Sequence, residues 1–377
     1  MNTVTGAMGL MTIDQREEAI LAPYATKSRE SLGREFPEKE HHYRGPFQRD
    51  RDRILHSAAY RRLSGKMQVF TGDQGDYHRT RLTHTQEVAS IARTLGRALR
   101  LNEDLIEALA LFHDIGHPPY GHAGEDALQE CLKNHGGFSH NQFGLTLARE
   151  LENPYPDFPG LNLTREVLAG QDHRAHKDSP IVPSLEVQLV DAADSMTYDA
   201  HDTDDAVKLA FVTLDDLSEL SLTGRLLRDI QQKFTSADPR TLRRNLAHDL
   251  IELQVTNLLE TTTARLEQTD FSSSAGVQEA RFRLVISEQL RREKSELEEF
   301  LYDRVYRHEE LIRVRSDAQH RLKMLFLHFC AQHQSLPERN EQRVQTIGRP
   351  RAVGEYLASM TDRYCDQRFD EVTAAGD

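Results

Sequence analysis

The stretch that decides the fold of this chain is LALFHDIGHPPYGHAGE, residues 109–125. In it, an apolar run passes directly into His113 and Asp114, and a turn rich in glycine and proline follows. Neighbouring residues of a helix point about 100° apart, so packing alone does not explain why an apolar helix ends in a histidine and an aspartate. An imidazole nitrogen and a carboxylate oxygen are suitable ligands for a divalent metal ion. The pair therefore predicts a metal site, provided that other parts of the chain supply more ligands.

Two further segments supply candidate ligands. Upstream, His84 shares one face of an amphipathic helix with apolar residues four, seven and eleven positions later, so its ring is expected to be buried. Downstream, Asp191 and Asp194 share a helical face with Tyr198, and a buried aspartate needs a cation or hydrogen-bond donors to offset its lost hydration. Together with the His-Asp pair, these positions give two imidazoles and two carboxylates, with either Asp191 or Asp194 as the second carboxylate. Such a set suits an octahedral ion with open water positions.

Composition and charge limit the classes of function. The formal net charge of −13 argues against general coating of nucleic acid, which requires a basic surface. One basic stretch, residues 44–66, carries seven Arg and Lys residues against two aspartates, and we expect it to face an anionic substrate. The three cysteines are widely spaced without a CxxC pair, which fits neither a disulfide framework nor a zinc–thiolate site. No segment reads as a signal peptide or membrane span, so the sequence predicts a soluble cytoplasmic protein without membrane contact.

The hydrophobic periodicity predicts a mainly α fold. Apolar residues recur at helical spacing along most of the chain, and the alternation typical of strands is scarce. Asn102 is a suitable N-cap for the helix that ends in His113, because its side chain can accept a hydrogen bond from a free amide of the first turn. The expected helices are 12–21, 43–63, 80–101, 103–114, 121–132, 163–170 and 185–201, followed by 242–259, 280–291, 296–307, 318–328 and 352–364.

The ligand pattern and the sequence around it resemble the HD superfamily of metal-dependent phosphohydrolases, and within it the bacterial dGTPase-like deoxynucleoside triphosphate triphosphohydrolases. The resemblance implies an HD-domain helical bundle with additional C-terminal helices. It divides the chain into an N-terminal arm at 1–45, a phosphohydrolase core at 46–215 and a helical region at 216–377 that completes the substrate pocket and the oligomer contacts. It is carried by residues 47–57, 61–63, 66–70, 79–84, 109–125, 137–141, 193–198 and 302–308.

The resemblance implies an activity and a cofactor. The expected reaction is hydrolysis of deoxynucleoside triphosphates, dGTP among them, to deoxynucleoside and tripolyphosphate. The cofactor would be one divalent ion, with Mn²⁺, Mg²⁺, Co²⁺ or Fe²⁺ as candidates. The resemblance selects Asp194 over Asp191, which is left as a supporting group. The metal ligands that it implies are His84, His113, Asp114 and Asp194.

The resemblance also implies roles for residues around the metal. His122 corresponds to the catalytic histidine of the family, Glu125 is expected to fix its tautomer, and His117 is expected to contact phosphate as the third catalytic residue. Tyr198 and Asp202 are expected to contact the sugar, with the ring beside the 2′ carbon and the carboxylate on the 3′ hydroxyl. The substrate-binding residues are Gln68, Val69, Arg81, His140, Asn141, Tyr198, Asp202 and Tyr306.

Several points stay open at this level. His140 and Asn141 either cap a helix or contact the substrate. Ser139 stands where the family commonly has an acidic residue, and residues 172–174 lack a phosphate-binding lysine that some members have there. Two alternative functions are an HD phosphohydrolase acting on nucleoside monophosphates or signalling nucleotides, and a binding protein that senses nucleotides. The resemblance implies a homo-oligomer, a hexamer or a tetramer, with a regulatory nucleotide and weak single-stranded DNA binding as further candidate partners.

Overall fold

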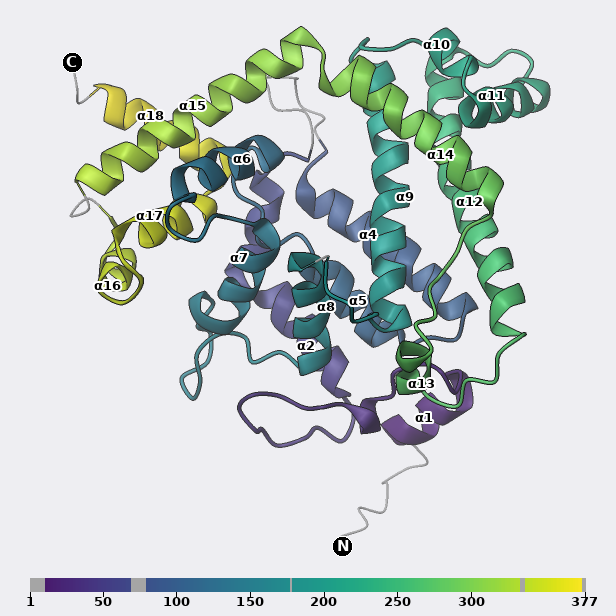
Figure 1. Cartoon of the computed structure of the whole chain (residues 1–377), viewed down its shortest axis with the longest axis horizontal. Coiled ribbons are helices and arrows are strands. Elements are labelled where there is room, and N and C mark those ends of the chain that lie inside the picture. Colours follow the sequence, from purple (N-terminus) through teal and green to yellow (C-terminus); the bar gives the residue numbers. More distant parts are fainter. Residues whose placement is uncertain (1–10, 69–78, 177, 333–335, 375–377) are drawn as a thin grey trace, which may run out of the picture.

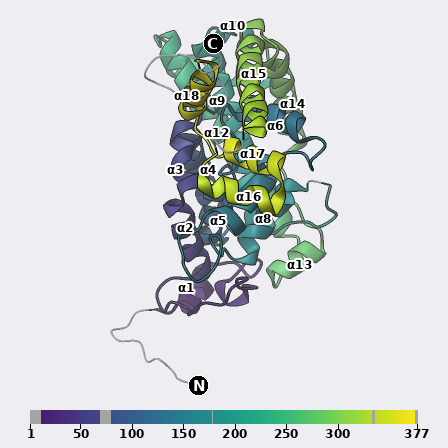
Figure 2. The same ribbon diagram turned by 90° about the vertical axis from the view of Figure 1, so that its left-hand side faces the viewer.

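The computed structural model describes residues 11–68, 79–176, 178–332 and 336–374. Within these ranges the regular secondary structure is helical, apart from isolated β-bridges between Arg34 and Thr164 and between Met67 and Thr80. The helices pack around one another without a sheet in the described part of the chain (Figures 1 and 2). The prediction of a mainly α fold with additional C-terminal helices is therefore confirmed.

Three helices form the centre of the molecule: α4 (Arg81–Ala98), α5 (Glu103–Phe112) and α9 (Leu185–Lys208) pack against one another. Two more, α2 (Pro46–His56) and α8 (Arg165–Ala175), cover other sides of α5. Because α5 is enclosed in this way, all seven of its apolar side chains are buried. Figure 1 shows α5 at the middle of the bundle, with α4 and α9 beside it.

Side-chain caps fix where two of these helices begin. The hydroxyl of Thr80 accepts a hydrogen bond from the amide of Thr83, and the hydroxyl of Thr83 accepts one from the amide of Thr80. At the start of α5, Asn102 Oδ1 accepts a hydrogen bond of 3.2 Å from the amide of Leu105, which confirms the predicted N-cap. The caps place His84 in the first turn of α4 and His113 directly after the last residue of α5.

A second, smaller hydrophobic cluster lies around the far half of α9. It is built by α10 (Leu214–Ser218), α11 (Ser221–Lys233), α12 (Pro239–Leu266) and α14 (Glu288–Leu301). Four short helices lie elsewhere between residues 13 and 279. They are α1 (Ile13–Ile20), α3 (Ala58–Arg62), α7 (His140–Thr146) and α13 (Ser274–Glu279).

The chain then returns to the first core. After the π-helical turn η4 (Tyr302–Tyr306), the long helix α15 (Glu309–Ala331) crosses back and packs on α6 (Gly121–Leu132). It also packs on α17 (Arg349–Ala358) and α18 (Asp362–Ala374), which Figure 2 shows together on the face toward the viewer. The short helix α16 (Glu338–Ile347) precedes them. The C-terminal helices therefore lie against the segment that follows His113 and Asp114.

The expected single helix at 43–63 is wrong. Ser57 is extended, with ψ 151°, and separates α2 from α3. Its hydroxyl accepts a hydrogen bond of 3.1 Å from the amide of Tyr60, and the carboxylate of Glu152 accepts hydrogen bonds from the first two amides of α3. A serine in a helical pattern thus acts as an N-cap, because a distant carboxylate adds further acceptors at the same point.

The expected helix at 280–291 is also wrong in its first half. Arg281 has a φ of 53°, and residues 282–287 have no regular secondary structure before α14 begins. The amides of this segment find acceptors on the side chains of α9 and α12, so tertiary hydrogen bonds replace the helical ones. The pairs are Leu284 N with Gln188 Oε1, Val285 N with Thr262 Oγ1, and Ser287 N with Asn257 Oδ1.

Candidate metal centre and active site

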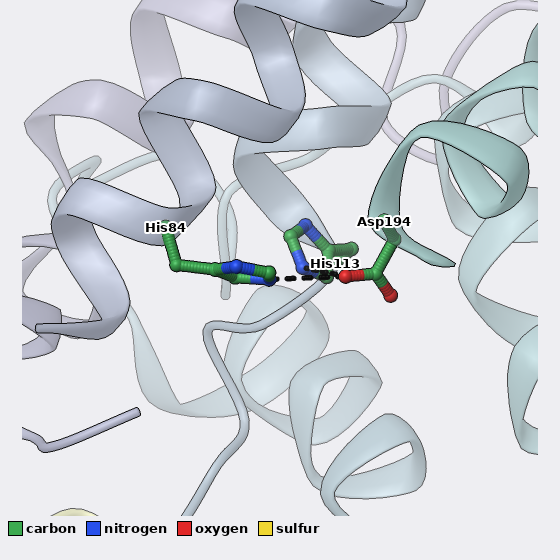
Figure 3. Close-up of side chains that lie close together, drawn as sticks. All are labelled: His84, His113 and Asp194. Atoms are coloured by element: carbon green, nitrogen blue, oxygen red, sulfur yellow. Dashed lines mark hydrogen bonds and ion pairs between the residues drawn. The ribbon is translucent and has the colours of Figure 1, made fainter. Parts of the chain in front are cut away.

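Three predicted metal ligands converge from three helices (Figure 3). His84 Nε2 lies 3.0 Å from Asp194 Oδ1, and His113 Nε2 lies 3.7 Å from the same oxygen. His84 comes from the first turn of α4, His113 from the end of α5 and Asp194 from the middle of α9. One potential donor atom from each residue lies within 4.8 Å of the others. This spacing fits three ligands of a single ion.

The orientation of His113 makes it a suitable ligand. Its Nδ1 lies 2.6 Å from the carbonyl oxygen of Ala110, so Nδ1 carries the proton and Nε2 keeps its lone pair. That buried Nε2 has no hydrogen-bond partner among the described residues. Burial lowers the pKa of His113, which favours the neutral ring that a metal requires. A buried acceptor left without a donor is costly unless a cation or water pairs with it, so these residues fit a divalent ion.

Asp114 lies between this cluster and a second one. Its Oδ1 is 3.4 Å from His113 Nε2 and 3.2 Å from His117 Nε2, and its Oδ2 is 2.9 Å from Arg81 Nη1. Burial would raise the pKa of Asp114, but its interactions with His113, His117 and Arg81 hold that pKa well below its usual range. Asp114, His117 and His140 also offer donor atoms within ligand distance of one another. Asp114 therefore lies between the His84, His113 and Asp194 cluster and the group that contains His117 and His140.

Asp191 is engaged elsewhere. Its Oδ1 lies 2.6 Å from Arg174 Nη2, whereas the other nitrogen of that guanidinium lies 3.6 Å from Asp194 Oδ2. Asp194 thus turns one oxygen to the two histidines and the other to Arg174. This geometry favours Asp194 as the ligand and gives Asp191 the role of holding an arginine beside it.

Three histidine rings form a group on the opposite side of Asp114. The ring of His117 stacks on that of His140 with centroids 3.8 Å apart, and it meets the ring of His122 at 5.5 Å, edge to face. The carboxylate of Glu125 was expected to orient His122, but its hydrogen bonds of 2.9 Å go to Nδ1 and the backbone amide of His140. Glu125 therefore fixes the tautomer of His140, and His122 is held by ring contact with His117.

Enclosure in the cavity lowers the pKa of His122 to about 4, and the nearby charge of Arg81 acts in the same direction. The ring is therefore neutral near pH 7. A bound polyanion would raise this pKa, because a neighbouring negative charge favours the protonated form.

A cavity of 590 Å³ joins these groups. Most of the predicted site residues line it, and His113 and Glu125 lie behind the lining. Val69 lies outside the described residues. The predicted residues that line the cavity are Gln68, Arg81, His84, Asp114, His117, His122, His140, Asn141, Asp194, Tyr198, Asp202 and Tyr306.

The wall beyond Tyr198 contains an unusual carboxyl group. Both oxygens of Asp202 are buried and have no hydrogen-bond partner in the part of the chain that the structure describes. Burial raises the pKa of Asp202 well above its usual range, and the negative charges of Asp205 and Asp199 add to this. This favours the protonated form, which can both donate to and accept from a hydroxyl.

Sequence reasoning did not identify several lining residues. Arg174 was noted only as a departure, and Asp199 was not considered. Asp199 pairs with Lys294, and burial raises its pKa to about 6. The pairing joins residues distant in sequence, so periodicity gave no signal for it. The others are His173, Ser195, Glu298, Leu301 and Tyr302.

The basic stretch at 44–66 does not face the cavity. In the described structure, none of its seven cations lines that space. Arg53 pairs with Glu38 at 2.7 Å and Arg51 with Glu107 at 3.2 Å. Carboxylates on neighbouring segments thus neutralise most of a cluster that was expected to meet substrate. The expectation is wrong because charge along the sequence does not indicate which side chains are already paired.

Comparison with known families identifies the class of protein to which the chain belongs. The HD domain matches residues 81–199, and the phosphohydrolase-associated domain matches residues 284–371. The chain is an HD-domain phosphohydrolase, and the HD bundle expected from the sequence is confirmed. No helix within the described ranges combines the length and apolarity needed to cross a membrane.

Individual relatives identify the family within this class. A deoxyguanosinetriphosphate triphosphohydrolase-like protein of Leptospira interrogans is 37% identical over 371 residues, covering 95% of this chain and 97% of the relative. One of Geobacter sulfurreducens is 39% identical, covering 94% and 95%, and one of Brucella canis is 41% identical, covering 91% and 93%. The chain belongs to the deoxyguanosinetriphosphate triphosphohydrolase-like proteins.

Proposed function

We propose that this protein hydrolyses deoxynucleoside triphosphates, dGTP among them, to deoxynucleoside and tripolyphosphate. The observation that carries the proposal is the buried, unpartnered Nε2 of His113, which faces Asp194 beside a 590 Å³ cavity. Two guanidinium groups, of Arg81 and Arg174, line the same cavity. A ligand site for a divalent ion next to two phosphate-binding groups is the arrangement that phosphoester hydrolysis requires.

His84, His113 and Asp194 would hold the ion, with Asp114 as the fourth ligand. When bound, the ion polarises an α-phosphate oxygen and lowers the pKa of a bound water. Mixed nitrogen and oxygen ligands with open positions suit Mn²⁺, Mg²⁺, Co²⁺ or Fe²⁺ better than a closed structural zinc.

The histidines would move the proton. Water attacks the α-phosphorus and loses one proton, and the bond to the 5′ oxygen of the sugar breaks as that oxygen gains one. His122, whose pKa rises when a triphosphate binds, is the group that would donate a proton to the departing oxygen. His117 and His140 line the path between His122 and Asp114, and Glu125 holds His140 in place.

The sugar would lie against α9. Tyr198 is one helical turn beyond Asp194, so its ring closes the space next to the ribose 2′ carbon. The carboxyl of Asp202, another turn along, has a raised pKa that favours its protonated form, and it would donate to or accept from the 3′ hydroxyl. Gln68 and Tyr306 would complete the wall, since both line the cavity.

The phosphorus product tests the proposal. The protein loaded with Mn²⁺ is incubated with dGTP and, separately, with dGMP, and the products are identified by phosphorus NMR. Tripolyphosphate from dGTP supports the proposal. Orthophosphate from dGMP would instead favour a nucleotidase, and dGTP binding without turnover would favour a nucleotide sensor.

The assembly is proposed to be a cytoplasmic homo-oligomer, a hexamer or a tetramer, on the basis of the family resemblance. Light scattering coupled to size-exclusion chromatography measures it directly. A monomer at micromolar concentration would contradict this part of the proposal.

A further inference from the structure

The corner between α17 and α18 lies against residues 117–122, the segment that carries His117 and His122 and is called the catalytic turn below. A helix was expected to run without interruption through 352–364, but the chain bends after Ala358 and restarts at Asp362. At this bend Thr361 comes so close to Gly65 that a Cβ on the glycine would lie 2.8 Å from the threonine methyl group. Such an approach across the fold suggests that the corner has a specific partner.

Asp362 supplies the contact. Its Oδ2 accepts a hydrogen bond of 2.8 Å from the amide of Met67, and its Oδ1 accepts one of 2.9 Å from the amide of Tyr120. An aspartate in the first turn of a helix ordinarily stabilises that helix through its free amides and dipole. Here both oxygens are directed to two other segments, so capping of α18 does not account for them.

One of these segments holds Arg81, and the other passes beside it. On one side, Arg81 N donates to the carbonyl of Lys66 at 2.9 Å, and Arg81 Nη2 donates to the carbonyl of Gln68 at 3.2 Å. The amide of Met67 lies between these two carbonyls. Arg81 in turn binds Asp114 at 2.9 Å. A shift of residues 66–68 would therefore move the guanidinium that lines the cavity.

The other segment carries His122. Tyr120 has a φ of 61° and Gly121 a φ of 57°, and the first of these is uncommon for a residue with a side chain. A Cβ on Gly121 would lie 2.6 Å from Arg81 Nη2, so this backbone passes directly beside the same guanidinium. A hydrogen bond to the amide of Tyr120 opposes relaxation of the left-handed turn that precedes His122.

We infer that Asp362 is a positioning residue, which fixes Arg81 and His122 relative to each other by holding the amides of Met67 and Tyr120. The inference rests on the proposed function, because it assigns these two groups to the reaction. A parallel tie supports it: Lys66 Nζ donates to the carbonyls of His117 and Ala358 at 2.5 and 3.0 Å. The C-terminal corner thus holds both sides of the catalytic turn.

Asp366 provides a matched control on the same helix. Its Oδ1 accepts hydrogen bonds of 2.6 Å from the hydroxyl of Tyr120 and from Arg321. It therefore contacts the side chain of Tyr120 but not the backbone amide that Asp362 binds. Asp366→Asn removes a carboxylate from α18 and leaves the two amide contacts intact.

The test compares Asp362→Asn with Asp366→Asn. Asparagine keeps one acceptor oxygen, so one amide loses its partner while the shape is conserved. We expect Asp362→Asn to lower kcat for dGTP about 10- to 100-fold, as small misplacements of catalytic groups do. Metal content and the stoichiometry of binding to a non-hydrolysable dGTP analogue should stay at wild-type values. Asp366→Asn should keep the wild-type kcat.

Two results would overturn the inference. One is a wild-type kcat for Asp362→Asn. The other is a loss of kcat matched by an equal loss of binding stoichiometry, which is what a purely structural role predicts. If wild-type protein releases no tripolyphosphate from dGTP, the proposed function fails and the contact itself is judged by hydrogen exchange.

Hydrogen exchange of the wild-type protein needs no variant and no activity. The amides of Met67 and Tyr120 should be protected and should exchange at similar rates, because one carboxylate holds both. Rapid exchange of either amide would overturn the inference even if Asp362→Asn does not fold.

Discussion

At the scale of single residues, the protonation pattern of His113 is the feature that defines the metal site. The carbonyl of Ala110 accepts a hydrogen bond from Nδ1, and Nε2 is left facing Asp194. Arg174 gives the two aspartates of α9 different roles. It pairs with Asp191, and it leaves one oxygen of Asp194 free for the histidines.

Asp194→Ala should lose most of the bound metal, because a mixed-ligand site with one carboxylate removed keeps only its imidazoles and Asp114. Elemental analysis measures the loss, and circular dichroism should show that the helices persist. Asp191→Asn is the matched control on the same helix face and should retain the metal. The assignment is wrong if the control loses metal and Asp194→Ala does not.

His122→Ala should lower kcat by about 10²–10⁴, the usual contribution of a positioned acid or base. Metal content and affinity for a non-hydrolysable dGTP analogue should stay near wild type. A variant that binds the analogue poorly but turns over dGTP at the wild-type maximal rate would make His122 a binding residue.

Tyr198→Ala should reduce the preference for dGTP over GTP. A 2′ hydroxyl pressed against the ring loses its hydration without a partner, which costs about 1–3 kcal/mol, or roughly ten- to a hundredfold in rate. Steady-state kcat/KM for the two nucleotides measures the change. Equal values of kcat/KM in the wild-type protein would contradict the role of the ring.

At the scale of helices, periodicity predicted the elements that carry the metal but not where the chain leaves a helix. The helix of His84, the Asn102 cap and the helix of Asp194 follow from local spacing and capping. The break at Ser57 and the extended segment before α14 depend on acceptors from distant residues, such as Glu152 and Gln188. No local pattern contains those partners, which also explains why Arg174 and Lys294 were missed.

Lys66 allows a test at this scale. Burial lowers its pKa from 10.5 to about 7, so the folded protein binds fewer protons at this site than the unfolded chain between these values. The stability that it contributes is therefore present above pH 10.5 and is lost as the pH falls toward 7. Lys66→Met removes this dependence, so the substitution should destabilise the protein more at pH 9 than at pH 7. Urea unfolding at pH 7 and pH 9 measures the free energy of unfolding of both proteins. An equal loss of stability at the two pH values would contradict the shifted pKa of Lys66.

At the scale of the whole molecule, the site is assembled from segments that lie far apart in the sequence. Helices α4, α5 and α9 supply the metal ligands, η4 supplies Tyr302 and Tyr306 to the cavity, and α18 holds the catalytic turn from outside. The formal net charge is −13, and the guanidinium groups of Arg81 and Arg174 line the cavity together with several carboxyl groups.

Metal removal should consequently lower the global stability. A ligand that binds only the folded state stabilises it by about 2.7 kcal/mol when present at 100 times its Kd. Chelation should lower the Tm of the wild-type protein, and added Mn²⁺ should restore it. Asp194→Ala should show the same Tm with and without Mn²⁺. If chelation left the Tm of the wild-type protein unchanged, this would contradict the binding of an ion between three helices.

The most direct test of the central claim is the fate of labelled oxygen when dGTP is hydrolysed in ¹⁸O water. Attack on the α-phosphorus puts one ¹⁸O into tripolyphosphate and leaves deoxyguanosine unlabelled, and mass spectrometry of the two products should show this. Label in deoxyguanosine would place the attack on the 5′ carbon, and labelled orthophosphate in place of tripolyphosphate would show a different phosphohydrolase. Either result would contradict the proposed reaction.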